Sequence, residues 1–425
     1  MGKAISYNPG VSMTPRLIVC TEEFPPRIFG SSVLLWNLLR ATAPEVEYLV
    51  LTSKPGVSAT GIVTVWKDLP GFLYRRDLKV GLSDIIRIFS VKFLSRKFLR
   101  IAKEFRPDAV VSVFPSDRYA LLGHRLSSAL GVPHAVYFHN LWEEVFRHAA
   151  VDPGFASDRH RLRLAREWEG VIVKACGSRY ALTEPMARFL SGKHGVPFLH
   201  VPHAFPPAPQ EITGQDDRGK RDALDLILPG SVYGMHVSSL RPLIELIGSR
   251  DDIRLTITTA QKREYLSSIG VSGSPHVEVE HFPGEASFAR RMQAADGCAV
   301  CLAGEGHSPE DVSVALPTRA VEALRFGKPL FVVAPEDSFL FRFVRGEGVG
   351  IAVSPGATGE IRAAMDTFLD PARREGFASN ARRLFDGMFS ARHVGPLWVG
   401  LVRNLAGRAS QPVRNPMKRA NHHVE

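Results

Sequence analysis

Two stretches of the sequence alternate short apolar runs with segments of helical periodicity, and a proline-rich break separates the two stretches. Segments such as Ser31–Leu39 and Ala120–Leu130 repeat apolar residues at helical spacing. In the first stretch we expect strands at Leu17–Cys20, Tyr48–Thr52, Ile62–Trp66, Ala109–Phe114 and Ala135–His139, with Val171–Ala175 leading into a further strand and helix. Strands that alternate regularly with helices predict a parallel, doubly wound sheet.

The break at Phe205–Arg221 is rich in proline and charge and lacks apolar periodicity, which is typical of a linker between domains. Beyond it we expect strands at Leu226–Leu228, Leu255–Thr258, Val277–Val279, Cys298–Leu302, Leu330–Val333 and Gly350–Val353, and helices near Ser239–Ile247, Lys262–Ile269, Ser287–Ala294 and Ala320–Phe326. The chain is therefore expected to be an α/β protein with two Rossmann-like, doubly wound parallel-sheet domains that face each other across a cleft. The expected limits are 14–204 for the first domain, 205–221 for the linker, 222–390 for the second domain, 391–407 for a C-terminal helix that could cross back to the first domain, and 408–425 for a disordered basic tail.

The composition excludes several other classes of protein. Apolar residues make up 45% and charged residues 23% of the chain, as in an ordinary globular protein. No apolar run approaches the ~18 residues of a membrane-spanning helix. Four cysteines are too few for a disulfide framework, and Cys298 and Cys301 lie in an apolar run, so we expect buried core cysteines and no metal site. No export signal is recognisable at the start, and we expect a cytoplasmic protein.

The formal net charge of +10 is concentrated in two segments. Ten basic and three acidic residues lie within Phe72–Arg106, and four basic and one acidic residue lie in the tail after Gly407. No nucleic-acid recognition module accompanies the basic residues, so we expect no nucleic-acid partner.

The internal basic segment alternates its charges with bulky apolar residues. An amphipathic helix of this kind could lie on an anionic membrane, with Arg75, Arg76 and Lys79 near lipid phosphates or an acceptor. The alternative is a helix whose apolar stripe belongs to the core. For Leu94–Phe105 we favour the core, because an apolar strand follows directly, whereas for Phe72–Phe93 both interpretations stay open.

Loops that follow strands are the candidate sites, because ligands of open parallel sheets bind outside the carboxyl ends of the strands. Gly30 and Ser31 follow the first strand and open a helix, where backbone amides could hold a diphosphate; the alternative is an ordinary turn with a serine cap. His139 ends a strand and could donate to a sugar hydroxyl or exchange a proton. The alternative for His139 is a structural role, as for most of the fifteen histidines.

The segment 316–329 is the most informative one. Pro317 and Thr318 start a helix, Glu322 lies one turn further on, and Gly327–Pro329 ends the helix. The helix start could offer amides to a phosphate, while the carboxylate could accept from two vicinal hydroxyls of a ribose. The alternative is a glutamate placed favourably near the positive end of a helix.

In their order and spacing, these motifs resemble the GT-B glycosyltransferases, and most closely the retaining group known as family 4. The resemblance extends from Leu17 to about Ser390. The residues that carry it are Phe24–Pro26 with Gly30, Arg106–Val111, Gly131–Pro133 with His139–Trp142, Pro317–Glu322 with Gly327–Pro329, Gly348–Gly350, and Asn380–Arg382 with Phe389–Ser390.

The resemblance implies a nucleotide-sugar donor, such as a UDP- or GDP-sugar, held mainly by the second domain, and no separate cofactor. Glu322 matches the ribose-binding glutamate of the family, His139 the residue near the transferred sugar, and Gly30 with Ser31 the glycine loop of the first domain. The residues implied around the diphosphate are Ser231, Lys262, Arg263, Pro317, Thr318 and Arg319, and those implied beside the base are Phe282 and Pro283.

The sequence departs from the family pattern in two places. The family motif has a second glutamate eight positions before Glu322, where this chain has Val314, and the nearby acidic residues Glu305, Glu310 and Asp311 are out of register. The loop 230–234 also lacks the arginine and lysine common in the family, for which Lys262, Arg263 or Arg319 could substitute.

The expected function is transfer of a sugar from a nucleoside diphosphate sugar to a hydroxyl acceptor in glycan or glycolipid biosynthesis. The resemblance implies retention of configuration without a metal. We expect a glycan or lipid-linked acceptor and a peripheral location at the inner face of the cell membrane. Two alternatives stay open, which are a non-catalytic nucleotide-sugar- or partner-binding protein of the same fold and a nucleotide-sugar epimerase.

Overall fold

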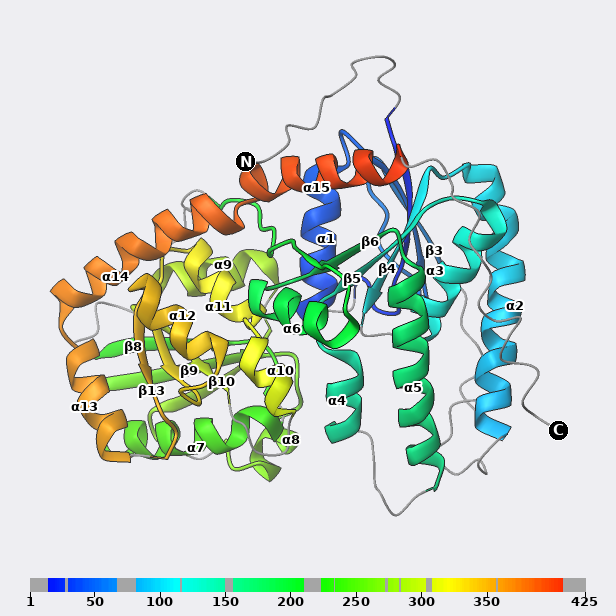
Figure 1. The fold of residues 1–425 in the computed structure, drawn as a ribbon. Helices are drawn as coiled ribbons and strands as arrows, with labels where there is room; N and C mark the ends of the chain where they lie inside the picture. Colours follow the sequence, from blue (N-terminus) through cyan, green and yellow to red (C-terminus); the bar gives the residue numbers. More distant parts are fainter. Residues whose placement is uncertain are drawn as a thin grey trace.

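The protein consists of two parallel sheets that lie side by side, each covered by helices (Figure 1). This is seen in a computed structural model that describes residues 14–26, 30–66, 82–114, 117–149, 156–209, 223–232, 234–271, 274–282, 284–302, 308–356 and 358–407. The two doubly wound sheets predicted from the sequence are confirmed.

The first sheet has seven strands in the order β3-β2-β1-β4-β5-β6-β7, and every neighbouring pair is parallel. Its elements are β1 (Arg16–Cys20), α1 (Gly30–Thr42), β2 (Glu47–Thr52), β3 (Ile62–Trp66), α2 (Leu82–Phe105), β4 (Ala109–Phe114), α3 (Asp117–Leu130), β5 (His134–Phe138), α4 (Trp142–Ala149), α5 (Ala156–Ala175), β6 (Ser178–Ala181), α6 (Glu184–His194) and β7 (Leu199–His200). The central strands β4 and β5 are buried along their whole length, which explains why they read as unbroken apolar runs.

The second sheet has six strands in the order β10-β9-β8-β11-β12-β13, again all parallel. Its elements are β8 (Leu224–Pro229), α7 (Gly234–Gly248), β9 (Ile253–Thr259), α8 (Arg263–Ser268), β10 (Val277–His281), α9 (Glu285–Ala294), β11 (Gly297–Cys301), α10 (Pro309–Val314), α11 (Thr318–Arg325), β12 (Leu330–Val333), α12 (Phe339–Glu347), β13 (Gly350–Val353), α13 (Thr358–Phe368) and α14 (Pro371–Leu384). In both sheets the order of strands reverses between the first and fourth strands, so each sheet has a switch point where ligands of such folds bind.

Two expectations about buried side chains are confirmed. Leu94 and Phe98 of α2 pack into the core beneath the first sheet, as expected for the apolar stripe of this helix. Cys298 and Cys301 are both buried, and they belong to the cores on opposite faces of the second sheet, so they do not form a redox pair.

Several helices were not expected from the sequence, among them α4, α5, α10 and α12. No helix is predicted between the strand at Cys298–Leu302 and the helix near Ala320–Phe326 before Pro317, but Pro309–Val314 forms the short helix α10. The Ser308 side chain caps this helix by accepting from the backbone N–H of Asp311.

The chain crosses between the domains at Phe205 and again at Ser390. The backbone N–H of Phe205 donates to the carbonyl of Phe389 at 2.9 Å, and the backbone N–H of Ala391 donates to the carbonyl of Phe205 at 2.7 Å. After the π-helical turn η2 (Phe385–Phe389), helix α15 (Ala391–Ala406) returns across the first domain and packs beside α1 (Figure 1). Of the expected linker, residues 210–222 lie outside the described residues, as does the basic tail 408–425.

Trp398 fastens the returning helix α15 to the first domain. Its indole N–H donates to the Tyr48 hydroxyl at 3.0 Å, and Tyr48 in turn hydrogen-bonds the Thr42 hydroxyl at 2.6 Å. The ring also lies 5.9 Å from that of Tyr137 and 5.8 Å from that of Tyr180. Trp398 is therefore the largest anchor between α15 and the sheet.

We expect Trp398→Ala to lower the free energy of unfolding by about 3–5 kcal/mol, because it removes a buried aromatic side chain and leaves the Tyr48 hydroxyl with one partner fewer. Urea unfolding followed by circular dichroism measures this change. The neighbouring Leu397 is 42% exposed, so Leu397→Ala is the matched control and should change stability by about 0.5 kcal/mol or less. Equal effects of the two substitutions would contradict the anchoring role.

Candidate functional site

His139 lies directly after β5 and is joined to the start of α1. Its backbone N–H donates to the carbonyl of Phe114, which continues the ladder between β4 and β5 by one residue. Its Nδ1 lies 2.6 Å from the Ser31 hydroxyl, at the amino-terminal end of α1. The two candidate loops of the first domain, separated by more than a hundred residues, therefore meet through these side chains.

Burial keeps the imidazole of His139 uncharged. The residue is only 4% exposed, and burial lowers its pKa from 6.5 to about 3. Among the described residues, Nε2 has no hydrogen-bond partner. When the Ser31 hydroxyl donates to Nδ1, Nε2 carries the ring proton and is a hydrogen-bond donor. Of the two roles considered for His139, this environment favours hydrogen-bond donation over proton exchange near neutral pH.

Gly30 faces the second domain at close range. A methyl group placed on Gly30 would come within 2.9 Å of the Thr318 hydroxyl oxygen at the start of α11. A larger residue at position 30 would require the Thr318 side chain to move. Gly30 and Thr318 were predicted as donor-site residues from separate motifs, and the structure places them next to each other.

Glu322 lies one turn into α11. Its side chain is 20% exposed, and its Oε1 lies 3.6 Å from Nη1 of Arg325. Burial raises the pKa of Glu322 to about 7; the nearby Glu285 acts in the same direction, and Arg325 opposes both. Near neutral pH the carboxyl group is therefore divided between its charged and uncharged forms.

The loops after β8 and β9 are joined beside α11. Nη2 of Arg319 donates to the carbonyl of Ser231 at 2.5 Å. The side-chain amide of Gln261 accepts from the backbone N–H of Val232 at 2.6 Å and donates to the carbonyl of the same residue at 2.9 Å. Lys262 comes next in sequence and is exposed, as is Arg263. Arg319 is thus held beside Ser231, where hydrogen bonds of Gln261 join the two loops. The sequence did not predict this role of Gln261, because the residue belongs to no recognisable motif.

Phe282 extends the ladder between β9 and β10 and lies against the second core. Its backbone N–H donates to the carbonyl of Thr259 at 2.8 Å, and its ring lies 5.6 Å from that of Phe288. Pro283 is outside the described residues, and so are the basic residues Arg75, Arg76 and Lys79. In the part of the chain that is described, no group of three or more His, Cys, Asp or Glu side chains could hold a metal ion.

A buried group of charges lies at the start of α4, directly after Leu141. Nζ of Lys193 lies 2.9 Å from Glu143, 2.7 Å from Glu144 and 2.6 Å from Glu169. These carboxylates are each 5% exposed or less. Arg166 also pairs with Glu143, at 2.7 Å, and burial raises the pKa of Glu144 while Lys193 opposes that rise. The group ties α4 to α5 and α6 and so fixes the segment that follows His139.

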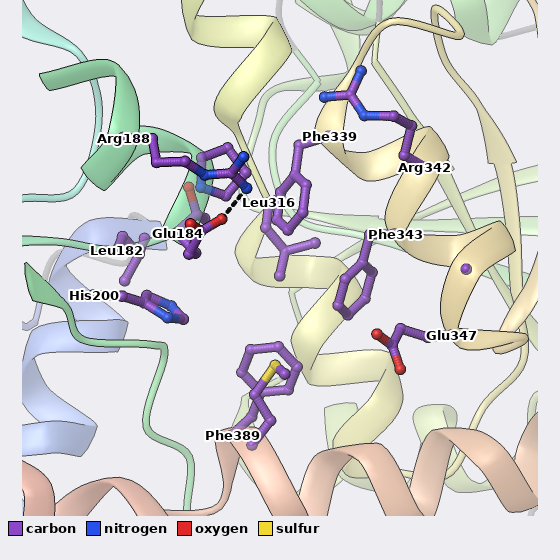
Figure 2. A pocket seen from close by; sticks show the side chains of 14 residues that line it. Leu182, Glu184, Arg188, His200, Leu316, Phe339, Arg342, Phe343, Glu347 and Phe389 are labelled. Carbon is purple, nitrogen blue, oxygen red and sulfur yellow. Dashed lines mark hydrogen bonds and ion pairs between the residues drawn. The ribbon is translucent and has the colours of Figure 1, made fainter. Parts of the chain in front are cut away.

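A cavity of about 630 Å³ lies between α6 of the first domain and α12 of the second (Figure 2). Its floor is apolar, and an ion pair between Glu184 and Arg188 lies at one side. Leu316 lines it, whereas Thr318 faces Gly30. None of the site residues that the sequence analysis selected lines this cavity, so it is separate from the candidate site.

The raised pKa of Glu322 should appear in the stability of the protein. Since the unfolded pKa is near 4.5 and the folded pKa about 7, the folded state retains this proton more tightly, so the residue destabilises the fold increasingly as pH rises from 4.5 to 7. We expect the free energy of unfolding of Glu322→Gln, minus that of the wild type, to be about 2 kcal/mol larger at pH 8 than at pH 5.

Thermal or urea unfolding at several pH values measures this difference. The matched control is Glu336→Gln, at an exposed position outside the candidate site, for which the difference should not vary with pH. A pH-independent difference for Glu322→Gln would contradict the raised pKa.

No protein-family model and no curated protein matches the sequence. The structure is similar to that of sucrose-phosphate synthase from Thermosynechococcus elongatus, with a TM-score of 0.70 and 14% sequence identity over 92% of this chain and 99% of that one.

Two further similar structures are Anabaena HepE in complex with UDP and WaaG, a glycosyltransferase involved in lipopolysaccharide biosynthesis. HepE has a TM-score of 0.62 and 14% identity over 92% of this chain and all of its own. WaaG has a TM-score of 0.61 and 14% identity over 91% of this chain and 99% of its own. The chain therefore has the two-domain GT-B fold that its motifs had indicated.

Proposed function

We propose that the protein is a glycosyltransferase that moves a sugar from a nucleoside diphosphate sugar to a hydroxyl acceptor. The observation that carries the proposal is the convergence of Gly30 and Thr318 from the two domains. His139 is hydrogen-bonded to Ser31, the neighbour of Gly30, and Glu322 lies one helical turn after Thr318. The likeness to HepE, whose structure contains UDP, supports the choice of donor class.

The second domain is suited to hold the nucleotide. The start of α11 lies opposite Gly30, and the backbone N–H groups at a helix start attract anions such as a diphosphate. Arg319 adds a positive charge at the same place, half-buried and held by the Ser231 carbonyl. Glu322 can accept from the two ribose hydroxyls, and binding would favour its charged form.

The first domain supplies an uncharged donor group. With Ser31 at Nδ1, the Nε2 proton of His139 can bond a hydroxyl of the transferred sugar. Cleavage of the bond between sugar and phosphate builds negative charge on the diphosphate, and preorganised amides with Arg319 would stabilise that charge. Contact between the domains excludes water, which would otherwise compete with the acceptor. We propose retention of configuration and catalysis without a metal ion, both from the resemblance in sequence.

We also propose a glycan or lipid-linked acceptor at an anionic membrane surface. From Ser90 onward, where its side chains are described, α2 exposes the basic residues Lys92, Arg96, Lys97, Arg100 and Lys103. Phe93 is 48% exposed, and Nζ of Lys97 lies 4.3 Å from the centre of its ring. A basic face with an exposed aromatic ring favours lipid headgroups. No helix in the described ranges is long and apolar enough to cross a membrane.

A non-catalytic nucleotide-sugar-binding protein of the same fold is the second candidate. The observation in its favour is Val314, which stands where the family motif has its first glutamate and is buried. No carboxylate at position 314 can therefore reach the donor. Binding of a donor without transfer to any of a broad panel of acceptors would favour this candidate, and product formed without an acceptor would favour an epimerase.

We expect Glu322→Ala to raise the KM for the donor roughly 10- to 100-fold, because a charged hydrogen-bond acceptor is lost from the ribose. We expect His139→Ala to lower kcat about 100-fold, because its donated hydrogen bond acts on the transferred sugar. The donor is first identified by the rise in melting temperature with UDP- and GDP-sugars. Transfer is then measured with glycan and glycolipid acceptors.

The matched controls are Glu336→Ala and His393→Ala, both at exposed positions, and they should retain wild-type kinetics. Wild-type activity of both Glu322→Ala and His139→Ala, with native circular dichroism, would contradict these site assignments.

We expect Arg75, Arg76 and Lys79, replaced together by glutamine, to weaken binding to anionic vesicles by roughly 100-fold, since each basic residue near such a surface contributes about 1 kcal/mol. Flotation with phosphatidylserine vesicles at 0.1 M salt measures the loss. The control replaces the three exposed arginines Arg362, Arg373 and Arg383 of α13 and α14, which changes the net charge equally. If both triple variants bind alike, the membrane surface is not at Arg75–Lys79.

A further inference from the structure

The short helix α10 contacts three separate segments of the first domain. Glu310 at its start pairs with Arg147 of α4, with 2.6 Å between Nη2 and Oε1. The carbonyl of Val314 at its end accepts from the Thr183 hydroxyl, the cap of α6, at 2.7 Å. Between them, Oδ1 of Asp311 accepts from the backbone N–H of Leu141 at 3.1 Å. A helix of the second domain thus directly contacts the first domain (Figure 1).

The bond from Leu141 to Asp311 is the most deeply buried of these contacts. Asp311 is 1% exposed and Leu141 is not exposed at all. Leu141 stands two residues after His139, on the short segment between β5 and α4. A buried carboxylate that accepts a backbone N–H fixes that N–H strongly, because no water competes for either group.

The other end of the same segment is fixed within the first domain. Glu143 and Glu144 anchor the start of α4 to Lys193. On the other side, His139 is held by β4 and Ser31. Leu141, in the middle, has its backbone N–H held only when the second domain is in contact.

We propose that Asp311 is a positioning residue that makes the placement of His139 depend on contact between the two domains. When the domains separate, the Asp311 carboxylate and the Leu141 N–H each form hydrogen bonds with water, and the segment after β5 loses the hydrogen bond that holds its middle. When they close, the carboxylate restores it and sets the imidazole toward the transferred sugar. The expected effect on the rate of transfer rests on the proposed function, whereas the hydrogen bond between Leu141 and Asp311 is independent of that function.

The geometry also assigns a use to the acidic residues near the position of the missing motif glutamate. Glu310 is engaged by Arg147 and Asp311 by Leu141, both in the first domain. A carboxylate engaged in this way acts on the protein rather than on the donor. Loss of Asp311 should therefore affect the rate of transfer and not the affinity for the donor.

The decisive variant is Asp311→Ala, and the matched control is Ser313→Ala on the same helix, whose hydroxyl bonds only within α10. We expect Asp311→Ala to lower kcat at least tenfold while the donor KM stays within threefold of wild type. Asp311→Asn keeps an acceptor oxygen and should recover most of the rate. Asp311→Ser, whose hydroxyl is too short to reach Leu141, serves if the alanine variant does not fold, and should behave as the alanine variant would.

Hydrogen exchange provides a readout that needs no turnover. With saturating UDP or GDP, whichever raises the melting temperature, amides of the segment 139–149 should exchange at least tenfold faster in Asp311→Ala or Asp311→Ser than in Ser313→Ala. If wild type shows no transfer at all, the proposed function fails, and exchange alone decides the role of Asp311. Kinetics and exchange equal to those of Ser313→Ala, or a donor KM raised as much as kcat is lowered, would overturn the proposal.

Discussion

The arrangement of the two domains depends on a pair of backbone hydrogen bonds at Phe205. Here the chain leaves the first sheet and, after Phe389, passes the same point on its way back. Because the two crossings are bonded to each other, the second domain is tied to the first through two strands of backbone. Helix α15 then lies where Trp398 can reach Tyr48, beside α1. The amino-terminal end of α1 carries Gly30, so the crossing indirectly sets how close Gly30 comes to α11.

Burial shifts the pKa values of two groups of the candidate site, so that near neutral pH His139 is uncharged and Glu322 is divided between its charged and uncharged forms. The pKa of His139 is lowered to about 3 and that of Glu322 raised to about 7, both because burial penalises the charged form. Burial of these two side chains costs free energy in the protein without a ligand, but both can form hydrogen bonds with a ligand that brings charge and hydroxyl groups. A diphosphate bound at α11 would be surrounded by protein groups in place of water, because contact between the two domains excludes solvent.

Sequence reasoning was successful where one local pattern determines a structure. Buried parallel strands such as Ala109–Phe114 are continuous apolar runs, and their order along the chain fixes the sheets. It was unsuccessful for α10, whose six residues begin with proline and two acids and resemble a loop. Its Ser308 cap is a local signal, but its contacts with the first domain are tertiary features. The pairing of Gly30 with Thr318 and of Leu141 with Asp311 joins residues far apart in sequence, so no local pattern could show it.

The departure from the family motif at Val314 has a structural explanation. A side chain at this position is buried, and the backbone carbonyl of the same residue holds the Thr183 hydroxyl, so the end of α10 is part of the contact between the domains. The acidic residues one turn earlier reach the first domain from the same helix. A glutamate at position 314 would place a charge in this buried contact, at a cost of several kcal/mol unless it were paired. The buried valine at position 314 therefore suits a helix that joins the two domains.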